Sequence, residues 1–144
     1  METNPLMPLV NTSRFILLGE DDEDDQDFLK EALHSIDHTY RFKAVSNGRN
    51  LLSFLEELED GNLPDLIVLD YNLPVLNGAE ILKILKDHDR YLSIPKIVWS
   101  TSKSPVFRAD CLSVGASDYI VKPTDVATFA EVAKYMTSFF KIGN

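Results

Sequence analysis

Short apolar runs alternate with longer amphipathic segments along most of this chain. The apolar runs and one alternating segment predict five strands, at 15–18, 40–45, 66–69, 96–99 and 117–121. Apolar residues at helical spacing between and after them predict five helices, at about 24–36, 48–60, 78–87, 105–114 and 124–140. Regular alternation of strand and helix is typical of a parallel sheet that is covered by helices on both faces.

The predicted fold class is therefore α/β, with a doubly wound five-stranded parallel sheet. The runs at 66–69 and 96–99 are continuously apolar, as burial on both faces requires, whereas charged residues alternate through 40–45, which indicates an edge strand. A chain of five such units fits the flavodoxin-like strand order 2-1-3-4-5. We expect residues 1–13, which contain two prolines, to form a flexible leader, and residues 14–144 to form one domain.

Four of the predicted strands end abruptly on polar residues. The first is followed by Glu20 and Asp21, and the others lead into Asp70, Ser100 and Lys122. Parallel strands place their carboxyl ends at one edge of the sheet, where open α/β sheets bind ligands. Carboxylates, a hydroxyl and an amine at one edge suit a metal ion and a phosphoryl group. Asp21, Asp70 and a backbone carbonyl of the following turn would suffice for Mg²⁺, which keeps several of its waters.

Each of these residues also has an ordinary structural interpretation. An aspartate in the position of Asp70 often caps a turn, Lys122 could be a surface lysine, and Tyr119 a half-buried ring. Residues 20–27 contain seven acids, which is more than a helix start needs, so a bound cation would relieve their repulsion. We interpret the later acids of this segment, at 23–27, as a solvated helix face.

Composition and charge exclude several classes of function. The chain has 144 residues, 44% of them hydrophobic and 26% charged, and a net charge of −9, which opposes nonspecific binding to nucleic acid or to anionic lipid. No apolar stretch approaches the roughly 20 residues of a membrane span. The single cysteine, Cys111, excludes an intrachain disulfide and fits a reducing, cytoplasmic location.

Five motifs, in order and at consistent spacing, together resemble the response-regulator receiver domain of two-component signalling. They are Glu20–Asp21, Asp70–Pro74 with Asn77–Gly78, Ile94–Pro95, Ser100, and Gly115–Pro123. The resemblance runs from about Arg14 to Phe140. The acidic start and the Ser100–Ser104 stretch are similar to stand-alone receivers of the kind that pair with bacterial phytochromes.

The resemblance implies a role for each acidic residue. Asp70 would accept a phosphoryl group from a phosphohistidine on a sensor histidine kinase or a histidine phosphotransfer protein. Asp21, Asp70 and the backbone carbonyl of Asn72 would bind Mg²⁺ directly, and Glu20 would contribute through a water molecule. Glu20 stands where the family more often has aspartate.

The resemblance also implies how the added charge is held and reported. Lys122 would pair with the phosphoryl oxygens, and Ser100, where threonine is more frequent, would hydrogen-bond to them. Tyr119 would change rotamer in response, and the Lys122–Pro123 peptide would be cis, as in many relatives. Trp99, directly before Ser100, is unusually bulky, and nothing in the sequence explains it.

The leading interpretation is thus a single-domain response regulator that slowly hydrolyses its own phosphoryl group and is not a turnover enzyme. It would act by contact with a downstream protein or a second copy, through the face formed by the predicted helix 105–114, strand 117–121 and the last helix. A Mg²⁺-dependent phosphatase of the haloacid-dehalogenase type is the enzyme alternative, although it needs an Asp-x-Asp pair after the first strand. A degenerate receiver that serves only as a scaffold is the third interpretation.

Overall fold

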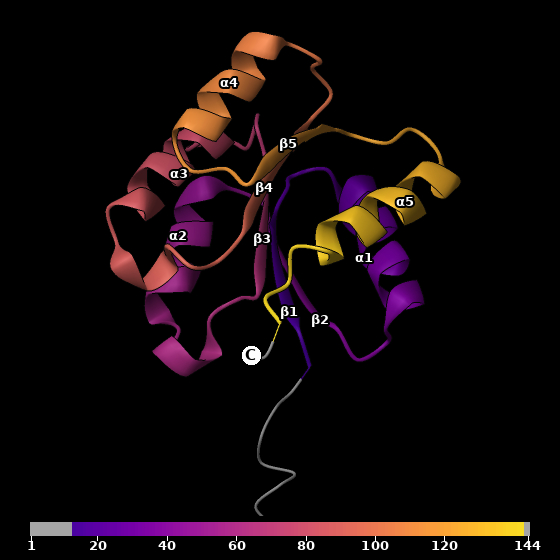
Figure 1. Cartoon of the computed structure of the whole chain (residues 1–144), viewed down its shortest axis with the longest axis horizontal. Coiled ribbons are helices and arrows are strands. Elements are labelled where there is room, and N and C mark those ends of the chain that lie inside the picture. The colour runs from indigo at the N-terminus through magenta and orange to yellow at the C-terminus, as the bar shows by residue number, and fades with distance from the viewer. Residues whose placement is uncertain (1–12, 143–144) are drawn as a thin grey trace, which may run out of the picture.

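The computed structural model describes residues 13–142, and it shows one parallel sheet between two layers of helices (Figure 1). The strands are β1 Phe15–Gly19, β2 Arg41–Val45, β3 Leu66–Asp70, β4 Lys96–Ser100 and β5 Asp118–Val121. The α-helices are α1 Glu23–Ile36, α2 Gly48–Glu57, α3 Gly78–Lys86, α4 Pro105–Ser113 and α5 Val126–Thr137. Two short 3₁₀ turns, η2 Asp60–Asn62 and η3 Asp89–Tyr91, precede β3 and β4.

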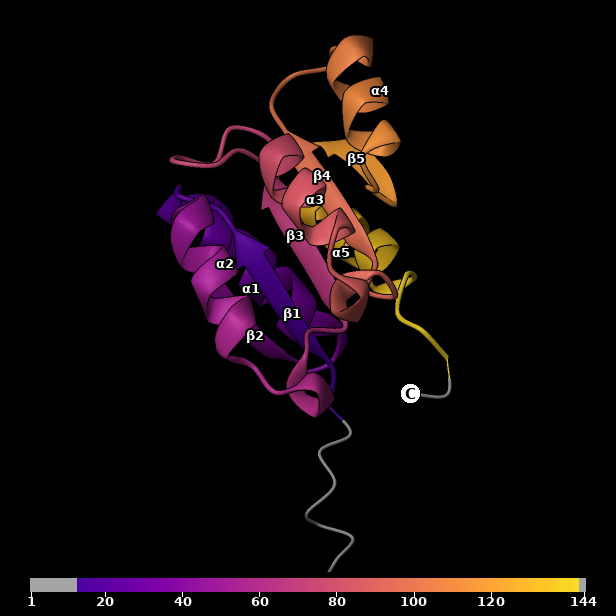
Figure 2. The ribbon, with the colours of Figure 1, turned by 90° about the vertical axis from the view of Figure 1, so that its left-hand side faces the viewer.

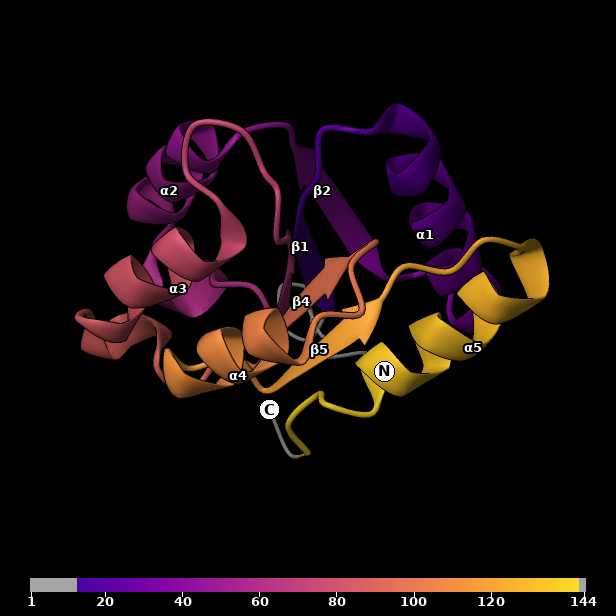
Figure 3. The same ribbon diagram turned by 90° about the horizontal axis from the view of Figure 1, so that it is seen from above.

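The strand order is β2-β1-β3-β4-β5, and every pairing is parallel, which confirms the predicted fold. Seen from above, α1 and α5 cover one face of the sheet, and α2, α3 and α4 cover the other (Figure 3). Figure 2 shows α2 and α3 in front of the sheet, with α4 beside β5 at its edge. None of the helices in residues 13–142 is long and apolar enough to cross a membrane.

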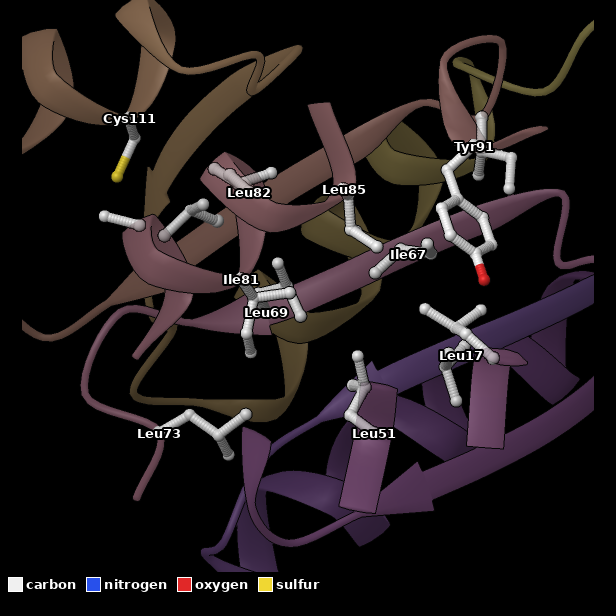
Figure 4. Close-up of a cluster of buried hydrophobic side chains, with 14 of the residues drawn as sticks. Leu17, Leu51, Ile67, Leu69, Leu73, Ile81, Leu82, Leu85, Tyr91 and Cys111 are labelled. Carbon is white, nitrogen blue, oxygen red and sulfur yellow. The ribbon is translucent and has the colours of Figure 1, made fainter. Parts of the chain in front are cut away.

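Alternate side chains of the central strands pack into two separate cores, one on each face of the sheet. Leu17, Ile67 and Leu69 point to the layer of α2 and α3, where they pack with buried residues of those helices (Figure 4). Their strand neighbours, among them Val68 and Trp99, point to the layer of α1 and α5. This two-sided burial explains why the central strands are continuously apolar, and it fixes which side chains can emerge at the carboxyl edge.

The predicted boundaries differ from the observed ones by a few residues. β3 and β4 each include the polar residue that was expected to follow them, because Asp70 pairs with Trp99 and Ser100 with Val121 in the sheet ladder. The last helix ends at Thr137, not at 140. The chain tightens there into a turn, and Phe139 and Phe140 pack against the core on the α1 and α5 side. The predicted leader, 1–13, lies outside the described residues except for Ser13.

Candidate functional site

An acidic cluster lies at the carboxyl edge of β1 and β3. Carboxylate oxygens of Glu20, Asp21 and Asp70 all lie within 4.8 Å of one another. Glu20 is completely buried, Asp70 is 5% exposed, and Asp21 faces solvent. Three carboxylates this close repel one another, and oxygen ligands at such spacing fit a hard divalent cation. The structure therefore brings together the acids that the sequence singled out.

Lys122 extends from the end of β5 into this cluster. Its ammonium Nζ lies 2.8 Å from Glu20 Oε1 and 3.3 Å from Asp70 Oδ2, and its side chain is only 10% exposed. The backbone N–H of Lys122 donates to the carbonyl of Ser100 at 2.8 Å, which anchors the start of the side chain beside β4. A buried cation and two buried carboxylates thus form one ion-paired unit.

Asp25 is a fourth acid of the site, and the sequence interpretation of it was wrong. It was assigned to a solvated helix face, yet its Oδ2 lies 3.1 Å from Lys122 Nζ and its side chain is 23% exposed. Asp25 lies in the first turn of α1, which Asp22 caps by accepting the Asp25 N–H at 3.0 Å. The packing of α1 against the sheet turns this one acid inward, whereas the neighbouring Asp24 stays exposed.

Burial and charge shift the ionisation of the two central groups. Burial raises the pKa of Glu20 to about 7, although hydrogen bonds from Lys122 and from the Asp22 backbone act in the opposite direction. Burial alone would lower the pKa of Lys122, but the hydrogen bond and charge of Glu20 and the charge of Asp70 outweigh it and raise that pKa. Lys122 is therefore charged at any physiological pH.

The turn after β3 holds the Asp70 carboxylate in place. Asp70 Oδ1 accepts the backbone N–H of Asn72 at 3.0 Å, and Gly78 N–H donates to the Tyr71 carbonyl at 3.2 Å. Gly48 closes the loop from the other side by donating to the Pro74 carbonyl at 3.0 Å. The side chain of Asp70 is thus aimed toward Lys122 before any ligand arrives.

Ser100 and Tyr119 are joined through the loop after β4. Ser100 is fully buried, and its Oγ accepts the backbone N–H of Ser102 at 3.1 Å. The Tyr119 hydroxyl donates to the carbonyl of the same Ser102 at 2.8 Å, with its ring 5% exposed. Tyr119 therefore points inward in this structure. No cis peptide occurs among residues 13–142, so the expected cis Lys122–Pro123 bond is trans, the isomer that X–Pro bonds favour by about 0.5–1 kcal/mol.

Comparison with known proteins identifies the family. A model of the response regulator receiver domain matches residues 16–134. The chain belongs to this family. Among curated relatives, the two-component response regulator ORR13 of Oryza sativa subsp. japonica is 30% identical over 125 residues, which span 87% of this chain and 99% of the relative.

Solved receiver structures share the fold over nearly their whole length. The phosphorylated cyanobacterial phytochrome response regulator RcpA is similar, with a TM-score of 0.80 and 29% identity over 90% of this chain and 94% of that one. The receiver domain of sensor histidine kinase PA1611 from Pseudomonas aeruginosa, solved with magnesium in its active-site cleft, has a TM-score of 0.70 and 25% identity over 88% of this chain and 99% of that one. Membership of this family argues against the phosphatase alternative.

Two residues of this receiver's site escaped sequence reasoning. Asp25 was hidden among seven acids in eight residues, and no spacing in the sequence distinguishes it from its acidic neighbours. Trp99 was noticed without an explanation, and the structure puts its ring beneath Lys122, with Nζ 5.4 Å from the ring centroid. Both residues contact the lysine that closes the site.

Proposed function

We propose that this receiver accepts a phosphoryl group on Asp70 from a phosphohistidine and passes its state on by protein contact. The observation that carries the proposal is the position of Lys122, 3.3 Å from an Asp70 carboxylate that is otherwise held by its own turn. In the transfer, an oxygen of Asp70 forms a bond to phosphorus while the bond from phosphorus to the histidine nitrogen breaks. Lys122 would stabilise the charge of the phosphoryl oxygens.

The acidic cluster supports a requirement for Mg²⁺. Asp21, Asp70 and the backbone carbonyl of Asn72 would hold the ion, and Glu20 would reach it through water. The fit rests on the three carboxylates within 4.8 Å of one another, whose repulsion Lys122 alone does not cancel. When bound, the ion supplies positive charge against the incoming phosphoryl group, which two neighbouring carboxylates would otherwise repel.

Ser100 and Tyr119 would report the phosphoryl group. The Ser100 Oγ accepts the N–H of Ser102 in the loop after β4, and donation of its own O–H to a phosphoryl oxygen would draw it toward Asp70 and lengthen that bond. That change would loosen the loop whose carbonyl holds the Tyr119 hydroxyl. A rotation of Tyr119 would then alter the α4–β5–α5 face, which we propose as the surface for a downstream protein or a second copy.

The donor would be a sensor histidine kinase or a histidine phosphotransfer protein, and the aspartyl phosphate would be lost by slow hydrolysis without repeated turnover. We propose a cytoplasmic location, which the single cysteine supports: Cys111 is free and buried, as is common in a reducing compartment. Residues 14–144 would form the receiver and residues 1–13 a separate leader.

Incubation with acetyl phosphate and Mg²⁺, followed by intact mass measurement, tests the proposal. We expect one phosphate per chain, no label with Asp70→Asn, and normal label with the control Asp110→Asn, whose exposed carboxyl lies on α4. Label that survives Asp70→Asn would overturn the assignment of the acceptor. Release of many phosphates per chain from a generic phosphate ester would instead support the phosphatase alternative.

A further inference from the structure

Trp99, the only tryptophan in the chain, lies in the core between the sheet and helices α1 and α5, and its ring contacts the site through Lys122. It is completely buried on the α1 and α5 side of the sheet. The ammonium of Lys122 lies over its indole ring, with Nζ 5.4 Å from the ring centroid. The face of an aromatic ring carries partial negative charge and attracts a cation at this distance.

An indole that served only to fill space at this position would carry an energetic cost. Its Nε1–H is buried and finds no hydrogen-bond partner among the residues that the structure describes. A buried donor without a partner destabilises the folded state, and a leucine or phenylalanine would avoid that penalty. The ring of Phe129 packs edge-on against Trp99, at 6.1 Å between centroids, so further aromatic surface is already present in this core. The contact with Lys122 is what an indole adds.

The backbone of Trp99 lies beside Asp70, the other half of the ion pair. It pairs with Asp70 across β3 and β4, and its carbonyl accepts the Tyr71 N–H at 3.0 Å, directly after the carboxylate. Its neighbour on the other side, Ile120, is two residues before Lys122 on β5. One residue thus lies between the strands that carry the carboxylate and the cation.

Lys122 is a flexible side chain that needs such support. Carboxylates from three elements hold its ammonium, Glu20 at 2.8 Å, Asp25 at 3.1 Å and Asp70 at 3.3 Å, all on the polar side of the group. The indole of Trp99 is fully buried, so no water reaches the side of the ammonium that faces it. The indole face covers this side and still attracts positive charge. The ammonium is then confined beside Asp70 without a further ion pair.

We propose that Trp99 is a positioning residue, whose indole face holds the Lys122 ammonium where the phosphoryl oxygens of a modified Asp70 must lie. The inference rests on the proposed function of Asp70. It assigns Trp99 no contact with the phosphoryl group or the metal. Its loss should therefore slow phosphorylation and weaken binding of a phosphoryl mimic without lowering Mg²⁺ affinity.

The experiment compares Trp99→Leu and Trp99→Phe with the control Phe129→Leu, which removes an aromatic ring from the same core without a contact to Lys122. The rate constant for labelling by acetyl phosphate at saturating Mg²⁺ should fall about 5- to 30-fold in Trp99→Leu, the range expected for a desolvated cation–π contact. It should fall about threefold in Trp99→Phe, since phenylalanine keeps a weaker face, and less than twofold in Phe129→Leu. Beryllofluoride affinity should follow the same order, and calorimetric Mg²⁺ affinity should fall by no more than about twofold in any of the three.

An NMR signature separates positioning from a general loss of core packing. In the wild-type protein the ε-methylene protons of Lys122 should resonate upfield, because the Nζ bonded to that carbon lies over the indole ring, 5.4 Å from its centroid. This ring-current shift should persist in Phe129→Leu and disappear in Trp99→Leu. Should Trp99→Leu not fold, the wild-type shift and the kinetics of Trp99→Phe decide the question.

Labelling of both Trp99 variants at the wild-type rate would overturn the inference while leaving the proposed function intact, and so would a Lys122 resonance in the wild-type protein without the upfield shift. A fall in Mg²⁺ affinity that accounts for the slower labelling would also contradict it. By contrast, failure of the wild-type chain to take up phosphate would refute the proposed function, and the ring-current measurement would still report whether Trp99 holds Lys122.

Discussion

Replacing Lys122 by methionine should make the free energy of unfolding depend on pH in a way that the wild-type protein does not. The substitution keeps an unbranched side chain, one atom shorter, and removes the charge that lies 2.8 Å from Glu20 and 3.3 Å from Asp70. Glu20 is completely buried, so its carboxylate would lose its nearest cation with no access to water. Removing one partner of a buried ion pair typically costs about 3–5 kcal/mol.

Protonation of Glu20 limits that loss, and the sign follows from its pKa. In the wild-type protein the pKa of Glu20 is raised from 4.5 to about 7, so the folded state binds a proton more tightly than the unfolded state. Stability therefore falls as pH rises from 4.5 to about 7 and then levels off. Without Lys122, which acts to lower this pKa, the fall should continue above pH 7, by about 1.4 kcal/mol per pH unit.

Urea unfolding in the presence of a chelator, at pH 6 and pH 8, measures the effect. We expect Lys122→Met to be less stable than wild type by about 2–3 kcal/mol at pH 6, and by at least about 1 kcal/mol more at pH 8. Lys83→Met, at an exposed position on α3, is the matched control and should change stability by less than about 0.5 kcal/mol at both pH values. An equal penalty at the two pH values would refute the reasoning, because it would mean that Glu20 takes up no proton when its cation is lost.

Two further substitutions test the loop that carries the site. Val75 adopts φ 74° with its side chain 62% exposed, a left-handed conformation that β-branched residues resist, so Val75→Asn should raise the free energy of unfolding by about 1 kcal/mol in urea. A loss of stability in that variant would show that the Val75 side chain contributes more than its backbone strain. A Cβ at Gly48 would clash with the Leu76 carbonyl oxygen, so Gly48→Ala should lower stability by about 2–3 kcal/mol, and an unchanged midpoint would contradict that packing.

The fold was predictable because the pattern that encodes it is local. Continuous apolar runs, an alternating edge strand and punctuating Gly and Pro residues define a doubly wound parallel sheet without knowledge of any contact. Strand and helix ends were less certain, since they depend on partners in space. Asp70 and Ser100 belong to their strands only because Trp99 and Val121 pair with them across the ladder.

The candidate site shows where sequence reasoning stops. The residues that end strands could be assigned to one edge, since parallel topology brings strand ends together. The inward orientation of Asp25 could not be predicted, because it depends on how α1 packs against the sheet. Its neighbours in the sequence carry the same charge. The contact between Trp99 and Lys122 joins two strands that pair in the sheet, yet it depends on the side-chain conformation of a lysine, which no periodicity encodes.

One chain of contacts links the charge in the site to Tyr119, the residue that we propose changes rotamer. Lys122 is bound at its ammonium to Glu20, Asp25 and Asp70, and at its backbone N–H to the Ser100 carbonyl. The Ser100 hydroxyl in turn accepts from Ser102, and the Ser102 carbonyl accepts from Tyr119. A change in what the ammonium binds therefore acts on the strand end whose hydroxyl orders the loop. Because the same lysine lies against the resting carboxylates and faces the proposed phosphoryl position, a change in the group that its ammonium binds would connect the proposed chemistry at Asp70 to the surface at α4 and β5.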